Sequence, residues 1–313
     1  MTLTLWCDET VALSTRQQLA ETLGGTHRWL SAGCSPDELR AAEVVIGQPA
    51  AELVIDLPRV RWVHIITAGF TAFDCDPVRQ ALQRKGTSVT NSSAVYADAC
   101  AQHALAMMLA RGRRLLSAHR EQLADRAWLR EELRGEVQLL TGETVLLLGF
   151  GAIGERLAEL LAPFHARVVA FRRQQRGGGP VEVIGEAGLP EALRRADHVV
   201  DILPLNASTQ DFMNAARFAA MRTGTTFYNI GRGNTVDQSA LIAELRTGRL
   251  HAYLDVTTPE PLPPGHELWT LPGCHITPHA AGGGRGEEQR QLHHILSNLA
   301  RFESGAPLLN RVI

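Results

Sequence analysis

An arginine flanked by two glycines follows an apolar stretch and is the first candidate for chemistry. Gly231-Arg232-Gly233 comes directly after residues 225–230, whose pattern predicts a buried strand. Ligands of open α/β sheets bind beyond the carboxyl ends of the strands, so we expect Arg232 at a ligand-binding edge. The planar guanidinium fork suits a carboxylate or a 2-oxo acid. The alternative is an ordinary arginine in a surface loop.

Two further stretches place an acid and a histidine after predicted strands. Asp255 ends one strand, and Glu260 follows it between two prolines in a rigid segment. His279 follows a short strand and precedes the small residues 280–284, which leave room for a bound ring. Taken alone, Glu260 could be an incidental acid of a Pro-rich loop. A lone histidine is likewise more often structural than catalytic.

Three glycines, at 149, 151 and 154, lie between two predicted strands within residues 144–171. Gly149 permits a tight turn from strand to helix, and Gly151 lets a pyrophosphate approach bare backbone. Gly154 lets the helix pack closely on the strand, with the helix N-terminus aimed at phosphate charge. Strand, glycines, helix and second strand in this order predict dinucleotide binding, against the alternative of a tight structural turn.

The residues after the second strand favour NADP over NAD. An NAD site usually has an acidic residue about 20 residues after the glycines, where it bonds the ribose 2′-hydroxyl. This chain has Arg172 and Arg173 there, with Arg176 beyond. Arginines could bind a 2′-phosphate in bidentate fashion. The alternative is a solvated basic loop before the glycines at 177–179.

Alternating strand and helix patterns predict an α/β protein with two Rossmann-like, doubly wound parallel-sheet domains and a cleft between them. We expect residues 1–95 and 285–313 to form a flavodoxin-like substrate-binding domain. Residues 96–284 would form the dinucleotide-binding domain. A helix over 96–123 would link the two and pack against another subunit. The final helix, 287–302, would lead the tail back to the first domain.

Composition narrows the class of protein. The 313 residues carry a net charge of -2, so the chain lacks the excess of basic residues that is typical of nucleic-acid-binding proteins. Five scattered cysteines without a C-x-x-C pair indicate a reducing cytosol and neither a disulfide framework nor a zinc site. No histidine spacing predicts another metal site. We expect no secretory signal and no membrane span, since no apolar run reaches about 18 residues.

Together, the motifs resemble those of the D-isomer-specific 2-hydroxyacid dehydrogenases. The resemblance covers nearly the whole chain and is strongest from 140 to 284; within the family it is closest to glyoxylate/hydroxypyruvate reductases. It is carried by Gly149-x-Gly151-x-x-Gly154, Leu203-Pro204-Leu205-Asn206, Gly231-Arg232-Gly233, Glu260-Pro261-Leu262-Pro263 and Thr277-Pro278-His279.

The resemblance implies a role for each candidate. Arg232 would anchor and polarise the 2-oxo acid, and His279 would be the general acid and base. Glu260 would hold the imidazole and favour its charged form. Asp255 would contact the nicotinamide end. The residues expected at the cofactor are Gly149, Gly151, Ala152, Ile153, Gly154, Arg172, Arg173, Leu203, Pro204, Ile230, Gly231, Asp255, His279 and Ala281.

The substrate would contact residues that lie far apart along the chain. Thr67-Ala68-Gly69 resembles the family loop whose backbone N–H groups hold the substrate carboxylate. Trp128 falls where related reductases have a tryptophan that can reach a neighbouring subunit's pocket. The residues expected at the substrate are Ala68, Gly69, Phe70, Trp128, Arg232 and His279.

Three departures from the family pattern stand out. Phe70-Thr71-Ala72-Phe73 precedes Asp74, where the family usually has one aliphatic residue before the acid. Gln102 replaces the glutamate of a common Ala-Glu-His motif. Arg172 replaces the acidic residue of NAD-dependent members.

The leading hypothesis is a cytosolic homodimer that reduces a small 2-oxo acid, such as glyoxylate or hydroxypyruvate, to the D-2-hydroxy acid with NADPH. One alternative is an NAD-dependent 3-phosphoglycerate or other D-2-hydroxyacid dehydrogenase. A less favoured one is a dinucleotide-sensing binding protein that resembles the C-terminal-binding co-repressors.

Overall fold

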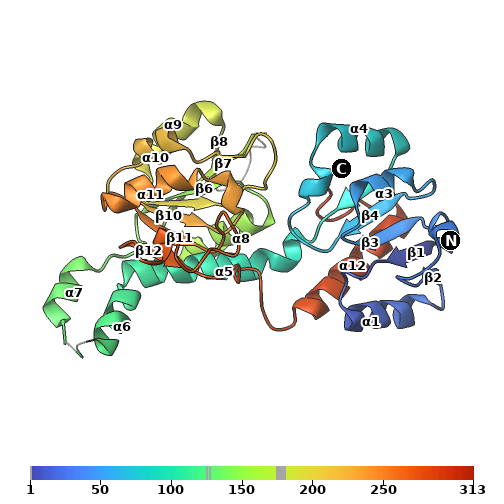
Figure 1. The fold of residues 1–313 in the computed structure, drawn as a ribbon, viewed down its shortest axis with the longest axis horizontal. Helices are drawn as coiled ribbons and strands as arrows, with labels where there is room; N and C mark the ends of the chain where they lie inside the picture. Colours follow the sequence, from blue (N-terminus) through green and yellow to red (C-terminus); the bar gives the residue numbers. More distant parts are fainter. Residues whose placement is uncertain (1, 125, 127, 174–180) are drawn as a thin grey trace. The chain divides into compact units, whose positions relative to one another are not determined.

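The computed structural model describes residues 2–124, 126, 128–173 and 181–313. The chain forms two compact units, Met1–Tyr96 with Gly283–Ile313, and Ala97–Gly282 (Figure 1). The sequence predicts domain boundaries at 95/96 and 284/285. Both units are built on parallel sheets, so the predicted α/β class is confirmed.

The first unit contains a five-stranded sheet in the order β2-β1-β3-β4-β5. Its strands are β1 (Thr4–Cys7), β2 (Arg28–Leu30), β3 (Val44–Gly47), β4 (Trp62–Ile65) and β5 (Ser88–Thr90). Its helices are α1 (Leu13–Leu23), α2 (Pro36–Leu39), α3 (Ala51–Asp56), α4 (Asp76–Lys85) and α12 (Glu287–Ser304). Helices α1 and α12 cover one face and α3 and α4 the other (Figure 1), so β3 and β4 are buried on both faces, as parallel strands require.

The second unit contains a seven-stranded sheet in the order β12-β11-β10-β9-β6-β7-β8. Its strands are β6 (Thr144–Leu148), β7 (Arg167–Phe171), β8 (Glu182–Ile184), β9 (His198–Asp201), β10 (Thr226–Asn229), β11 (His251–Leu254) and β12 (Cys274–Ile276). The strand order reverses between β6 and β9. That switch point is where ligands bind in doubly wound sheets.

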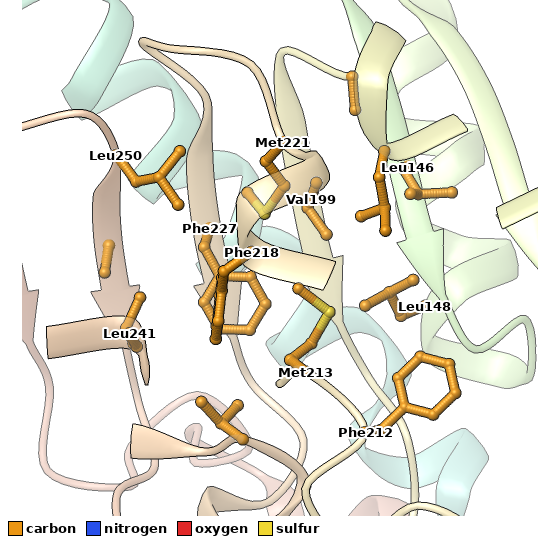
Figure 2. Close-up of a cluster of buried hydrophobic side chains, with 14 of the residues drawn as sticks. Leu146, Leu148, Val199, Phe212, Met213, Phe218, Met221, Phe227, Leu241 and Leu250 are labelled. Carbon is orange, nitrogen blue, oxygen red and sulfur yellow. The ribbon is translucent and has the colours of Figure 1, made fainter. Parts of the chain in front are cut away.

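Helices cover both faces of this sheet (Figure 1). They are α5 (Ser93–Gly112, which crosses the boundary of the units), α8 (Ala152–Leu161), α9 (Leu189–Arg195), α10 (Ala215–Ala220) and α11 (Gln238–Arg246). Figure 2 shows the core beneath α10 and α11, where Phe218 meets Phe227 of β10 edge-on with ring centroids 5.3 Å apart. Short 3₁₀ turns occupy Thr71–Phe73, Ala162–Phe164, Glu186–Gly188, Gly233–Thr235 and Glu267–Trp269.

The predicted single helix over 96–123 is wrong. The structure has two helices there, α5 and then α6 (Leu115–Leu123), followed by α7 (Arg130–Glu136). Helix α5 ends at Gly112, and Arg114 adopts a left-handed backbone conformation with φ of 56°. A left-handed residue cannot continue an α-helix, so the chain turns at this point. The apolar periodicity alone conceals that break.

The carboxyl-terminal tail rejoins the first unit, as predicted. The Val89 N–H donates to the Ile313 carbonyl over 3.1 Å, and the Val312 N–H donates to the Val89 carbonyl over 2.8 Å. These bonds attach residues at the end of the chain to β5. Among the helices that the structure describes, none is both long and apolar enough to span a bilayer.

Candidate active site

The glycine turn between β6 and α8 has the geometry of a phosphate-binding loop. Gly149 has φ of +102°, which favours glycine, and a Cβ on Gly154 would lie 2.9 Å from the Gly149 carbonyl oxygen. A Cβ on Gly151, in contrast, would meet no atom of the described residues within 4 Å. No side chain from the described part of the chain caps the N-terminus of α8. Open space beside an uncapped helix start fits the pyrophosphate of a dinucleotide.

Arg172 and Arg173 directly follow β7, the neighbour of β6 in the sheet. Arg172 is half-buried, and its backbone N–H bonds the Ile184 carbonyl. The exposed Arg173 donates from Nη1 to Ser208 Oγ over 2.8 Å. Ser208 belongs to the loop after β9, so this bond links the loops that follow β7 and β9. Arg176 lies outside the described residues.

Both glycines around Arg232 are dictated by close backbone contacts. A Cβ on Gly231 would lie 2.9 Å from the Leu203 carbonyl oxygen, and one on Gly233 would lie 2.0 Å from the Thr257 carbonyl oxygen. The loop after β10 is therefore packed between the loops after β9 and β11. This contact joins the segment of Arg232 to the segment that leads to Glu260.

Arg232 has a fixed backbone and a guanidinium with spare donors. Its carbonyl accepts hydrogen bonds from Asn229 Nδ2 over 3.0 Å and from Thr235 Oγ1 over 2.7 Å. Its own Nη1 donates to the Gly231 carbonyl over 2.7 Å. A guanidinium has five N–H donors, so most of them stay available for a ligand carboxylate.

A buried acid that sequence reasoning missed organises the same loops. Asp201, at the end of β9, is fully buried and accepts hydrogen bonds from the Leu203 N–H over 2.9 Å and from Thr235 Oγ1 over 2.6 Å. Burial raises the pKa of Asp201 to about 7, against the opposing effect of these two donors. The signal in the sequence was a carboxylate that closes an apolar strand.

Glu260 and His279 form the ion pair that the motifs predict, because Oε1 of Glu260 contacts Nδ1 of His279. Their side chains are 40% and 50% exposed, so both can be reached from solvent. His279 has φ of 52°, and its N–H donates to the Asp255 carbonyl over 2.8 Å. Within the described ranges, Nε2 of His279 has no hydrogen-bond partner and is available to a substrate.

Asp255 holds the backbone of the His279 loop. Its buried carboxylate accepts bonds from Thr277 Oγ1 over 2.6 Å and from the N–H groups of Ala280 and Ala281, each over 2.9 Å. Nε2 of His103 lies 3.1 Å from the same Thr277 hydroxyl. Three donors thus occupy this carboxylate, while its contact with the nicotinamide end stays a prediction.

Gln238 supports the loop of Glu260 and was not predicted. Its amide makes two bonds to the Thr258 backbone: Nε2 donates to the carbonyl over 2.6 Å, and Oε1 accepts from the N–H over 3.0 Å. Nothing in the sequence distinguishes Gln238 from an ordinary first residue of α11. Its role depends on α11 and the loop after β11 being neighbours.

The predicted substrate loop belongs to the first unit. Thr67 donates to the Gly69 carbonyl over 2.7 Å, and Asn91 Nδ2 donates to the Ala68 carbonyl over 2.7 Å. Within the described part of the chain, the N–H groups of Ala68, Gly69 and Phe70 donate to no protein acceptor. The loop therefore offers backbone donors of the kind that bind a carboxylate.

Two further observations concern Trp128 and metal binding. Trp128, between α6 and α7, is 90% exposed, so it packs on little of its own chain. Among the residues that the structure describes, no group of three or more His, Cys, Asp or Glu side chains could hold a metal ion.

Comparisons with known proteins identify the family of this chain. Residues 105–281 match the family model of the D-isomer-specific 2-hydroxyacid dehydrogenase NAD-binding domain. A glyoxylate reductase of Aeropyrum pernix is 32% identical, with 81% of this chain and 76% of that protein covered. The human glyoxylate reductase/hydroxypyruvate reductase is 34% identical, with 72% of this chain and 70% of that protein covered.

A solved structure is also similar along the whole chain. It is a D-isomer-specific 2-hydroxyacid dehydrogenase from Xanthobacter autotrophicus in complex with NADPH and MES. It is 25% identical with a TM-score of 0.80, and the match covers 100% of this chain and 98% of that one. The chain therefore belongs to the D-isomer-specific 2-hydroxyacid dehydrogenase family, whose members are NAD(P)-dependent oxidoreductases.

Proposed function

We propose that this protein reduces a small 2-oxo acid of the glyoxylate or hydroxypyruvate type to the D-2-hydroxy acid with NADPH. The observation that carries the proposal is the Glu260–His279 pair, in which Glu260 belongs to the loop that packs against the loop of Arg232. A carboxylate-paired imidazole at the same sheet edge as a guanidinium suits proton transfer to a carbonyl oxygen that bears negative charge.

The chemistry divides between these residues. Arg232 binds the 2-oxo acid and polarises its carbonyl, and the N–H groups of Ala68 and Gly69 hold the substrate carboxylate. When bound, NADPH supplies the hydride that reaches the carbonyl carbon. His279, held at Nδ1 by Glu260, gives a proton from Nε2 to the carbonyl oxygen. General acid help of this kind contributes about 10²–10⁴-fold.

The preference for NADPH is argued from charge. Arg172 and Arg173 follow β7, where an NAD-dependent site would place an acid for the ribose hydroxyls. A 2′-phosphate gains charge-assisted hydrogen bonds from these arginines, and NADH has no such group. The NADPH in the Xanthobacter relative supports this choice. The contacts of Leu203, Pro204, Ile230 and Ala281 with the cofactor belong to the same proposal.

We also propose that the protein acts as a homodimer in the cytosol. The segment from α6 onward exposes Leu115 (55%), Leu123 (71%) and Trp128 (90%) to solvent. Large exposed apolar side chains that lie near one another in sequence are typical of an interaction surface. The five cysteines are all free, as expected for a reducing compartment.

One assay tests cofactor and substrate together. The protein is mixed with NADPH or NADH and with glyoxylate, hydroxypyruvate, pyruvate or 3-phosphohydroxypyruvate, and cofactor consumption is followed by absorbance. We expect the highest kcat/KM with NADPH and glyoxylate or hydroxypyruvate. Equal or faster turnover with NADH would contradict the cofactor proposal. The highest kcat/KM with the phosphorylated acid would favour a phosphoglycerate dehydrogenase, and turnover of none would favour a binding protein.

A further inference from the structure

A small cavity lies in the second unit, away from the carboxyl ends of its strands. Its walls come from α5 and α6 and from the amino-terminal ends of β11 and β12, including His251 and His275. The cavity has a volume of about 150 Å³. The Arg232, Glu260 and His279 loops follow the opposite ends of β10, β11 and β12. The cavity is therefore separate from the proposed catalytic site.

The charged side chains that line the cavity are all basic. Arg111, Arg114 and Arg120 border it, and among the described residues no aspartate or glutamate does. Arg114 pairs with Glu136 over 2.6 Å, whereas Arg111 and Arg120 form no ion pair with any described residue. The Nε atoms of Arg111 and Arg114 are buried and have no hydrogen-bond partner among the described residues. Buried guanidinium donors without an acceptor are costly, so a ligand with acceptor atoms would stabilise these groups.

The two histidines and a tyrosine complete the lining without adding negative charge. Burial, followed by the charges of Arg111 and Arg114, lowers the pKa of His251 to about 4. Burial, followed by Arg120 and Arg111, also lowers the pKa of His275. Both imidazoles are therefore neutral at pH 7 and can donate or accept hydrogen bonds, as can the Tyr253 hydroxyl.

We propose that this cavity binds one oxyanion group, a phosphate or a carboxylate. Guanidinium groups bind both in bidentate fashion, and the unpaired Nε donors would gain acceptors. A cavity of about 150 Å³ suits a single anionic group. Pockets for whole drug-sized ligands span roughly 300–1,000 Å³, so a dinucleotide does not fit. The oxyanion comes either from a free small ion or from an acidic side chain of a second copy of this chain.

Calorimetric titration with inorganic phosphate at constant ionic strength tests the site. The protein is first saturated with NADP⁺, so that phosphate cannot report on the cofactor site. We expect Arg111→Ala to weaken phosphate binding at least tenfold. Ser117→Glu, which adds a carboxylate to the cavity wall, should abolish binding. Arg113→Ala is the matched control, because Arg113 is exposed on the same turn and does not line the cavity.

Sedimentation of the same proteins identifies the source of the oxyanion. For a free ion, the mass stays constant across phosphate concentrations and variants. If the oxyanion is an acidic side chain of a second copy, the dimer should dissociate at micromolar protein concentration. The measured mass should then fall on addition of phosphate and in the variants Arg111→Ala and Ser117→Glu. Two results together would overturn the proposal. The masses would stay unchanged, and phosphate would either not bind or bind equally to the wild type and to both cavity variants.

Discussion

Asp255 and Glu260 position His279 through different atoms. The Asp255 carboxylate binds the backbone N–H groups of Ala280 and Ala281, which fixes the loop beyond the histidine. Glu260 binds the ring at Nδ1, which leaves Nε2 for the substrate. Because one acid acts on the backbone and the other on the imidazole, their substitutions should differ in effect. Loss of Glu260 changes proton transfer, whereas loss of Asp255 displaces the loop.

Cofactor preference is testable at a single residue. Arg172→Asp places an acid where NAD-dependent relatives have one, so it should repel the 2′-phosphate and bond the ribose hydroxyls instead. We expect the ratio of kcat/KM for NADPH over NADH to fall at least tenfold, which is about 1.4 kcal/mol. Steady-state kinetics with both cofactors provide the measurement. Arg195→Asp, an exposed charge reversal at the end of α9, is the control. An unchanged ratio would mean that Arg172 does not face the ribose.

The catalytic candidates were accessible from sequence because their neighbours are unusual. An arginine between glycines, an acid between prolines and a histidine before small residues all stand out in the printed chain. Asp201 and Gln238 did not, because their importance comes from partners 34 and 20 residues away, Thr235 and Thr258. Such hydrogen bonds depend on which loops become neighbours, and residue type does not reveal that.

The turn from β6 to α8 places two glycines under different constraints. Gly154 faces protein backbone, whereas the space beside Gly151 is open. The spacing of the glycines predicted this turn correctly, since strand, turn and helix are local in sequence. The break between α5 and α6 escaped prediction because the apolar period continues past Arg114 while the backbone turns there.

Alanine at these two glycines should separate binding from stability. Gly151→Ala meets no protein atom within 4 Å, so the melting temperature should stay within a few degrees while the Kd for NADPH rises at least tenfold. Gly154→Ala brings a Cβ to 2.9 Å from the Gly149 carbonyl, so it should destabilise the fold by about 1–3 kcal/mol. Thermal melts and fluorescence titration with NADPH measure both effects. Equal cofactor affinity in wild type and Gly151→Ala would exclude a phosphate at Gly151.

Over the whole molecule, stability should depend on histidines that are buried in the neutral form. His64 is fully buried in the first unit, with Nδ1 2.9 Å from Thr90 Oγ1 and Nε2 3.1 Å from Ser92 Oγ. Burial, and to a lesser degree His294, lowers its pKa to about 3. The unfolded chain binds a proton near pH 6.5 and the folded one does not. The contribution of neutral His64 to the free energy of unfolding is therefore fully present above pH 6.5 and is lost as the pH falls toward 3.

Chemical denaturation at pH 7 and pH 5 checks this dependence. His64 alone should lower the free energy of unfolding by about 2 kcal/mol over this interval, since each pH unit below 6.5 costs about 1.4 kcal/mol. His64→Asn removes the titrating group and should reduce the difference between the two pH values. His119→Asn, on the exposed side of α6, should leave it unchanged. Equal differences in wild type and His64→Asn would show that His64 does not titrate in this way.

The division of the chain into two units followed from the alternation of strands and helices and from the returning C-terminal helix. The register of the sheets required long-range pairing that no local pattern contains. Strands β2 and β8 have three residues each, so their patterns were too short to predict.

The central claim is that His279 transfers a proton during hydride transfer and contributes little to cofactor binding. Single-turnover reduction of glyoxylate by His279→Ala, with NADPH affinity measured separately by fluorescence, tests it most directly. We expect the rate to fall about 10²–10⁴-fold while the Kd for NADPH changes less than about threefold. A rate within about tenfold of wild type, or a parallel loss of cofactor binding, would contradict a general acid at His279.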